Sequence, residues 1–140
     1  FGGLHLKPED TLLIRGATCA LGYAAVQIAK AIGCRVIATT HKEEKLELLQ
    51  AADLAVVDTG KLAGTLPEVS RALELVGPRT LPDTLCCVQK GGIVCNTGIL
   101  GGVGVWNWFD PIKDIPNGVF LTGFYSNKPE QKVLQEILDF

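Results

Sequence analysis

The chain has 140 residues, of which 47% are hydrophobic and 20% are charged, so it is long enough for one folded domain and too apolar for a disordered segment. Thirteen basic residues stand against fifteen acidic ones, which gives a formal net charge of −2. A nucleic-acid-binding domain would carry a basic excess, so this balance excludes nucleic acid as a partner.

Short apolar runs alternate with amphipathic segments along the chain. Strands are expected at residues 11–15, 35–39, 54–57, 72–76, 92–96 and 119–123. Helices are expected at 20–32, 42–50, 81–88 and 128–139, with a helical turn at 67–71. The apolar residues of the last helix are expected to face the core: Val133, Leu134, Ile137 and Leu138.

Several of the expected strands are continuously apolar, as strands covered on both faces must be. Their alternation with helices predicts a doubly wound α/β fold, in which a six-stranded parallel sheet carries helices on both faces. Residues 91–109 have no formal charge, but their six glycines and two asparagines favour a buried strand and a Gly-rich loop over a membrane span. No membrane is therefore expected as a partner.

The side chains Trp106, Trp108 and Phe109 occur together in an expected loop. They either cover another domain or subunit, or fold back as a small hydrophobic cluster. The five cysteines are odd in number and contain no C-x-x-C pair, which indicates a reducing cytoplasm and no zinc site in this chain. Three of them are expected to be small core residues: Cys86, Cys87 and Cys95.

A Gly-rich turn joins the first expected strand to the first expected helix. It reads Gly16, Ala17, Thr18, Cys19, Ala20, Leu21 and Gly22. Such a turn lets backbone N–H groups and the positive helix end face a pyrophosphate. In the G-x-G-x-x-G register only the third glycine, Gly22, is present, and Cys19 stands at the second position. The turn predicts a dinucleotide site, with an ordinary strand-to-helix turn as the alternative.

This loop, followed by A-V-Q-I-A-K at 25–30 and Gly33, resembles the zinc-independent quinone oxidoreductase branch of the medium-chain dehydrogenase/reductase superfamily. The sequences L-E-L-V-G at 73–77 and K-G-G-I-V at 90–94 extend the resemblance over nearly the whole chain. The resemblance implies that residues 1–140 form an NAD(P)-binding Rossmann domain. It also implies that the N-terminal catalytic, GroES-like domain of that family is absent from this chain.

The end of the second expected strand bears on the choice of nicotinamide cofactor. An NAD-selective Rossmann fold carries an Asp or Glu there for the ribose 2′-hydroxyl, and this chain has none. Two hydroxyls and three basic side chains are found instead: Thr39, Thr40, His41, Lys42 and Lys45. These groups favour a 2′-phosphate, so NADP(H) is expected rather than NAD(H). The alternative is a solvated helix face on which the lysines pair with neighbouring glutamates.

The rest of the cofactor wall is expected beyond the carboxyl ends of the last three strands. On the adenosine side it comprises Val76 and Gly77, and toward the nicotinamide Thr97, Gly98, Ile99, Leu121 and Thr122. Each of these segments has a plain loop as its alternative. No residue of the chain is assigned to proton transfer, and no metal ligand is expected in it.

The resemblance implies the cofactor-binding part of a reductase, which transfers hydride between NADPH and a quinone, enone or other carbonyl substrate. It is expected to work in the cytoplasm as a homodimer and to be inefficient without its substrate domain. Short-chain dehydrogenases have a similar loop, but their Tyr-x-x-x-Lys pair is absent after Tyr23 and Tyr125. The open alternatives are a zinc-type alcohol dehydrogenase cofactor domain, a non-enzymatic NAD(P)-sensing module and a methyltransferase-like domain.

Overall fold

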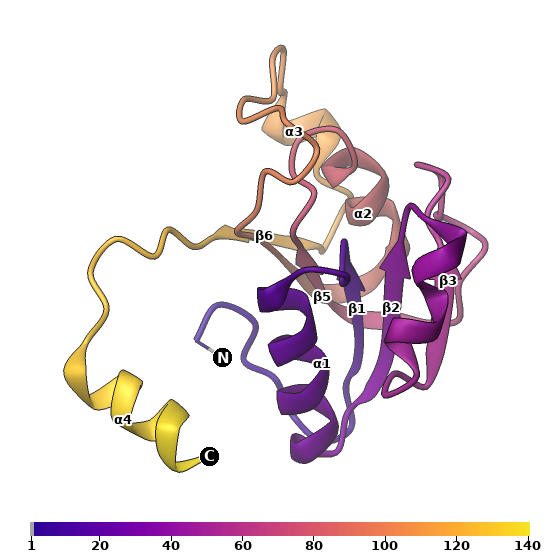
Figure 1. The fold of residues 1–140 in the computed structure, drawn as a ribbon. Helices are drawn as coiled ribbons and strands as arrows, with labels where there is room; N and C mark the ends of the chain where they lie inside the picture. Colours follow the sequence, from indigo (N-terminus) through magenta and orange to yellow (C-terminus); the bar gives the residue numbers. More distant parts are fainter. Residues whose placement is uncertain (1) are drawn as a thin grey trace.

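The structure, a computed structural model, describes residues 2–140 and contains one six-stranded parallel sheet in the order β3-β2-β1-β4-β5-β6 (Figure 1). The strands are β1 (Thr11–Arg15), β2 (Arg35–Thr40), β3 (Leu54–Val57), β4 (Val69–Glu74), β5 (Val88–Asn96) and β6 (Phe120–Gly123). The helices are α1 (Ala20–Ile32), the 3₁₀ helix η1 (Glu43–Leu49), α2 (Leu81–Cys87), α3 (Pro111–Asp114) and α4 (Gln131–Asp139). The predicted doubly wound parallel sheet is confirmed.

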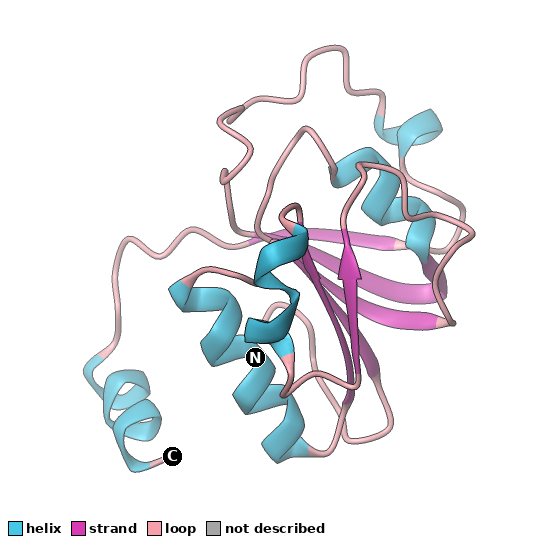
Figure 2. Cartoon of the chain, turned by 45° about the vertical axis from the view of Figure 1, so that its right-hand side comes forward, coloured by secondary structure: helices cyan, strands magenta, loops and turns pink. Residues whose placement is uncertain are grey.

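Both faces of the sheet are covered by helices (Figure 2). Leu12 of β1 belongs to the same buried cluster as Val26 of α1, whereas the adjacent Leu13 belongs to the cluster that contains Leu85 of α2. Because successive side chains of a strand point to opposite faces, α1 and α2 lie on opposite sides of the sheet. This arrangement is the physical reason that the central strands are apolar without alternation.

The fourth strand differs from its prediction. The sequence predicts a helical turn at 67–71 and a strand at 72–76, but β4 already begins at Val69. Val69 is fully buried and pairs with Val88, and the register shifts between Val69 and Arg71. The burial of Val69 in the core under α2 therefore outweighs the turn preference of the residues before it.

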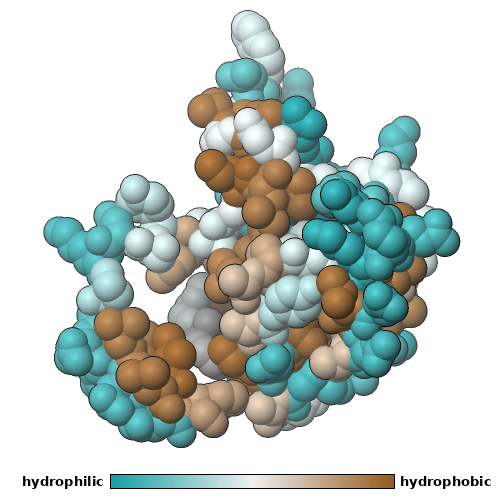
Figure 3. Space-filling model, viewed as in Figure 1, coloured by the Kyte–Doolittle hydropathy of each residue, from teal (hydrophilic) through white to brown (hydrophobic). Residues whose placement is uncertain are grey.

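Helix α4 stands away from the rest of the molecule at the end of an extended segment (Figure 1). The prediction that its apolar residues face the core was wrong, because all four are exposed: Val133 by 46%, Leu134 by 43%, Ile137 by 53% and Leu138 by 80%. Figure 3 shows them as a brown surface on the inner side of the helix. Periodicity identified the apolar face of this helix but not what covers it.

The aromatic loop divides between the two predicted arrangements. The rings of Trp106 and Phe109 pack with their centroids 4.5 Å apart, and Trp106 joins the cluster under α2. Trp108, in contrast, is 98% exposed and has a φ of +62°. The loop therefore folds back through Trp106 and Phe109 and presents Trp108 to solvent.

The cysteines are all free thiols, but they are not all core residues. Cys95 is buried and Cys87 half-buried, as predicted, whereas Cys86 is exposed, so the prediction for Cys86 was wrong. Cys86 precedes Cys87 near the end of α2, and a two-sided helix can bury only one of two adjacent residues fully. None of the helices within residues 2–140 is both long enough and apolar enough to cross a bilayer.

Candidate functional site

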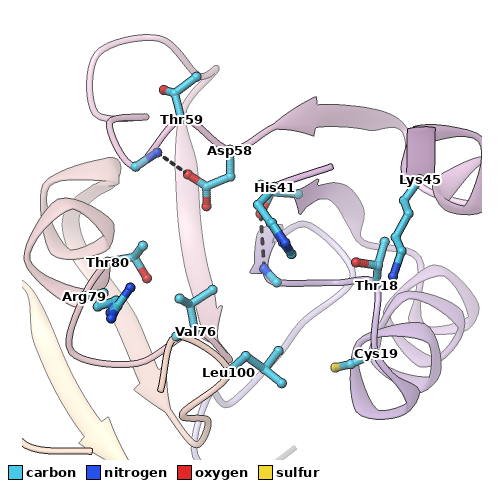
Figure 4. A pocket seen from close by; sticks show the side chains of 14 residues that line it. Thr18, Cys19, His41, Lys45, Asp58, Thr59, Val76, Arg79, Thr80 and Leu100 are labelled. Carbon is cyan, nitrogen blue, oxygen red and sulfur yellow. Dashed lines mark hydrogen bonds between the residues drawn. The ribbon is translucent and has the colours of Figure 1, made fainter. Parts of the chain in front are cut away.

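A cavity of about 610 Å³ opens at the carboxyl ends of β1, β2 and β4 (Figure 4). Its volume is in the range of about 300–1,000 Å³ that is usual for small-molecule sites. From β1 the sheet runs to β2 and β3 in one direction and to β4, β5 and β6 in the other. The cavity therefore lies at the point where the strand order reverses, and in α/β sheets this is where ligands bind.

Seven residues of the predicted cofactor site line this cavity: Gly16, Thr18, Cys19, Thr39, His41, Lys45 and Val76. The other predicted residues are not among those that line it: Ala17, Ala20, Leu21, Gly22, Thr40, Gly77, Thr97, Gly98, Ile99, Leu121 and Thr122. Two of these, Leu21 and Thr97, instead line a second cavity of about 400 Å³ beside α1. The structure thus brings the loop, the end of β2 and the end of β4 together, but not the predicted nicotinamide side.

The backbone conformation at position 16 and the close neighbours of this residue both favour glycine there. Its φ is +82°, and a Cβ added there would lie 3.0 Å from Val76 and 3.2 Å from Leu100. Its N–H donates to Oγ1 of Thr39 over 3.1 Å, and the N–H of Ala17 donates to the Thr39 carbonyl over 2.8 Å. The start of the loop is therefore tied to the end of β2, in a left-handed conformation that glycine adopts readily.

Gly22 brings α1 close to the loop. A Cβ at this position would lie only 2.2 Å from the carbonyl oxygen of Ala17. Cys19 caps the helix with a φ of −134°, which any residue can adopt, and its Sγ accepts the Gly22 N–H over 3.3 Å. Cysteine at this position therefore keeps the turn. The amides of Ala20 and Leu21, in the first helical turn, have no acceptor within the helix itself and are available to an anion.

The two threonines at the end of β2 hold the loop in place through their hydroxyls, and Thr39 also lines the cavity. Thr39 is fully buried and bound to Gly16. Thr40 is also buried, its hydroxyl lies 3.2 Å from that of Thr18, and it accepts the N–H of Lys42 over 3.3 Å. Both hydroxyls therefore already bind groups within the protein.

The basic side chains near the end of β2 do face the cavity. His41 and Lys45 both line it, and across it the loop after β4 adds Arg79 (Figure 4). Within residues 2–140 none of the three takes part in an ion pair, so the alternative pairing of Lys45 with a nearby glutamate is not observed there. The charges of Lys45 and Arg79 and the imidazole of His41 are therefore available to a ligand.

Half of the lining was not anticipated from the sequence: Asp58, Thr59, Gly60, Arg79, Thr80, Leu100 and Gly101. Asp58 directly follows β3, and Arg79 follows the turn at Gly77. The rule that ligands gather at the carboxyl ends of parallel strands would have found Asp58 if it had been applied to the third strand. No motif in the sequence marks Arg79.

Asp58 is the one acidic residue among the described residues that line the cavity, and it is paired with Arg15. Nε and Nη2 of Arg15 donate to the two oxygens of Asp58 over 2.6 and 2.8 Å, and Nη1 donates to Asp83 over 2.7 Å. Burial alone would raise the pKa of Asp58, but the hydrogen bonds and charge of Arg15 hold it below its ordinary value. Burial alone would lower the pKa of Arg15, but the two carboxylates raise it. The pair is therefore ionised and internally compensated.

Glu74, at the end of β4, is a second buried carboxyl group. Its Oε1 accepts the N–H groups of Val76 and Gly77 over 2.8 and 3.0 Å, and its Oε2 accepts the hydroxyls of Thr80 and Thr84. Burial raises the pKa of Glu74 despite these four donors. The side chain fixes the turn that carries Val76 and Arg79 to the cavity.

Comparison with known proteins identifies the family. The sequence model of the zinc-binding dehydrogenase family matches residues 20–140. The chain is 30% identical over 105 residues to the acryloyl-coenzyme A reductase of Sulfurisphaera tokodaii, an alignment that covers 73% of this chain and 31% of the reductase. The crystal structure of AibC superimposes with a TM-score of 0.82 at 32% identity, over 95% of this chain and 38% of that one. The quinone oxidoreductase of Thermus thermophilus, solved also with NADPH, gives 0.76 at 26% identity, over 95% and 44%.

The chain spans about a third of the length of that curated relative. The family's description refers to zinc, but within residues 2–140 no group of three or more His, Cys, Asp or Glu side chains is placed to hold a metal ion. No residue of the described chain is therefore assigned to zinc. The Gly-rich loop, the helix end and the basic cavity instead fit a nucleotide. The chain belongs to the zinc-binding dehydrogenase family, and it is a nucleotide-binding Rossmann domain of the medium-chain dehydrogenase/reductase superfamily.

Proposed function

We propose that the cavity holds NADP(H), and that the chain is the cofactor-binding part of an enzyme that transfers hydride between NADPH and a quinone, an enone or another activated carbonyl. The charge of the cavity carries this proposal. Three basic side chains, His41, Lys45 and Arg79, line it, and its one acidic residue, Asp58, is neutralised by Arg15. NADPH offers a pyrophosphate and a 2′-phosphate, and both prefer such surroundings.

Different residues of the chain bind different parts of the cofactor. The first-turn amides of α1, at Ala20 and Leu21, face the pyrophosphate with the positive end of the helix behind them. Lys45 offers a compact positive charge and His41 an imidazole hydrogen bond to the 2′-phosphate. Thr39 and Thr40 hold the loop between these groups. When bound, NADPH supplies the hydride itself.

The relatives support both parts of the proposal. An acryloyl-coenzyme A reductase and a quinone oxidoreductase are both redox enzymes by name, and the second was solved with NADPH. Electron-poor carbonyl compounds and quinones are accordingly the substrate class to test first with the complete enzyme. The choice among them lies with residues outside this cavity, because a cofactor site alone does not select the hydride acceptor.

The first test is a parallel calorimetric titration of the chain with NADPH and NADH. NADPH is expected to bind at least about tenfold more tightly, a difference of about 1.4 kcal/mol. Lys45→Ala should remove most of this preference and leave NADH affinity unchanged. Lys42→Ala is the matched control, because Lys42 is exposed and lies outside the cavity. Tighter binding of NADH would overturn the NADP assignment, and no binding of either nucleotide would overturn the site.

A further inference from the structure

Arg15 is a charged residue in an unusual place. It is the last residue of the central strand β1, and its side chain is fully buried. It precedes Gly16, the first residue of the loop at the cavity, but Arg15 itself does not line the cavity. A buried guanidinium is strongly unfavourable unless its charge and its N–H groups are matched. The groups that bind the Arg15 guanidinium therefore indicate which segments this residue holds in place.

Arg15 joins two acidic residues from distant parts of the chain. Asp58, directly after β3, binds Nε and Nη2, and Asp83, in the first turn of α2, binds Nη1 over 2.7 Å. The same Nη1 lies 3.0 Å from the hydroxyl of Thr84 and 3.3 Å from the carbonyl oxygen of Thr80. One planar guanidinium thus fixes the end of β3 against α2, which a lysine with its single nitrogen cannot do.

Both carboxylates also bind the backbone of a single loop. Oδ1 of Asp58 accepts the N–H of Gly60 over 2.8 Å, the contact drawn as a dashed line in Figure 4. The two oxygens of Asp83 accept the N–H groups of Leu62 and Ala63 over 2.8 and 3.2 Å. The loop 58–63 is therefore attached at its start and at its end to carboxylates that Arg15 holds. The first three residues of this loop form part of the cavity wall.

We propose that Arg15 is a positioning residue for the adenosine half of the cofactor, acting through Asp58 and Asp83 on the wall formed by residues 58–60. The inference rests on the proposed binding of NADP(H). These residues follow β3 and lie next to His41, on the β2–β3 side of the switch point, and away from β5 and β6 (Figure 4). The wall therefore bounds the part of the cavity that takes the phosphorylated adenosine, not the nicotinamide.

Arg15 also offsets the negative charge of Asp58 at this wall. Its fork occupies both oxygens of Asp58, so the carboxylate does not oppose a phosphate bound at His41 or Lys45. Substitutions can separate the effect of Arg15 on the position of the loop from its effect on the charge of the wall. Arg15→Lys keeps the charge but cannot bind Asp58 in bidentate fashion and Asp83 at the same time. Asp83→Asn keeps the Arg15–Asp58 pair, but it removes the ion pair of Asp83 with Nη1 of Arg15 and weakens the attachment of the far end of the loop.

The test is the affinity of the chain for 2′,5′-ADP and NADPH by calorimetry, together with amide hydrogen exchange of the 58–65 segment. Arg15→Lys is expected to weaken 2′,5′-ADP by at least about tenfold and to accelerate exchange at Gly60, Leu62 and Ala63. Asp83→Asn should produce a smaller loss of the same kind, about threefold. Because Asp83 is partly exposed at the surface, this variant serves if Arg15→Lys does not fold.

The matched control is Arg71→Lys. Arg71 lies on β4, binds the Leu4 carbonyl over 2.7 Å and approaches Asp10, and is remote from the cavity lining. It should lower thermal stability without changing 2′,5′-ADP affinity. Equal losses of affinity in Arg71→Lys and Arg15→Lys, or a faster-exchanging loop with unchanged affinity, would overturn the positioning role. Failure of the wild-type chain to bind either nucleotide would instead overturn the proposed function, and this inference with it.

Discussion

Replacement of Gly22 by alanine should separate α1 from the loop that it supports. A Cβ at this position would lie 2.2 Å from the oxygen and 2.6 Å from the carbonyl carbon and Cα of Ala17. All three atoms are backbone, so none can rotate away. To reach ordinary van der Waals distance the helix would have to recede by roughly 1 Å, which disturbs the close packing beneath the cavity.

The expected cost follows from two opposing effects. Overpacking of a filled interior typically costs about 1–3 kcal/mol, and the rigid obstacle places Gly22→Ala near the upper end. Alanine in a helix is favoured over glycine by up to about 1 kcal/mol. The net loss of unfolding free energy should therefore be about 2 kcal/mol. Nucleotide affinity should fall at least about tenfold, because the amides of Ala20 and Leu21 move with the helix.

Urea denaturation followed by far-ultraviolet circular dichroism measures the first effect, and calorimetric titration with NADPH the second. Gly104→Ala is the matched control, because nothing lies within 4 Å of the added Cβ and Gly104 is not in the left-handed region. A Gly22→Ala variant that matches the control in stability and in affinity would refute the close-packing role of Gly22.

Three further predictions address the pH dependence, the last helix and the thiols. The folded-state pKa of Asp58 lies below its ordinary value of 3.8. The contribution of Asp58 to stability is therefore complete above pH 3.8 and is lost as the pH falls through the folded-state pKa. The fall in unfolding free energy toward acid pH should accordingly be shallower for Asp58→Asn than for wild type. Ile137→Ala should lower the unfolding free energy by less than about 1 kcal/mol, since the side chain is 53% exposed, whereas a loss of about 2–5 kcal/mol would show that α4 packs fully against the core. Burial raises the pKa of the Cys87 thiol to about 12, so at pH 8 in Ellman's assay Cys86→Ser should remove one rapidly reacting thiol and Cys87→Ser none.

The first half of the fold was predictable because its local signals agree. The apolar run of β1, the loop and the pattern of α1 up to Gly33 all indicate a strand, a tight turn and a helix. The need for glycine at position 22 also followed, since the third glycine of such loops allows the helix to approach the strand. Even Cys19 keeps the turn, because a helix cap requires an extended backbone and a hydrogen-bond acceptor rather than a glycine.

What the sequence did not predict depends on partners that are distant along the chain. Val69 is a strand residue because of its place in the core under α2, which no local pattern reports. Asp58 lines the cavity because β3 ends there, and its charge is offset by Arg15, 43 residues earlier. The exposure of α4 has the same origin, because its amphipathic pattern does not specify the surface that it meets.

These long-range contacts also explain why the cavity presents a basic surface in a chain whose net charge is −2. Its two acidic neighbours, Asp58 and Glu74, direct their oxygens toward donors within the protein: the Arg15 guanidinium for one, and two amides and two hydroxyls for the other. The basic residues Lys45 and Arg79 form no ion pair within residues 2–140, so their charge remains for a ligand. The basic character of the cavity thus depends as much on the internal pairing of carboxylates as on the cations at its surface.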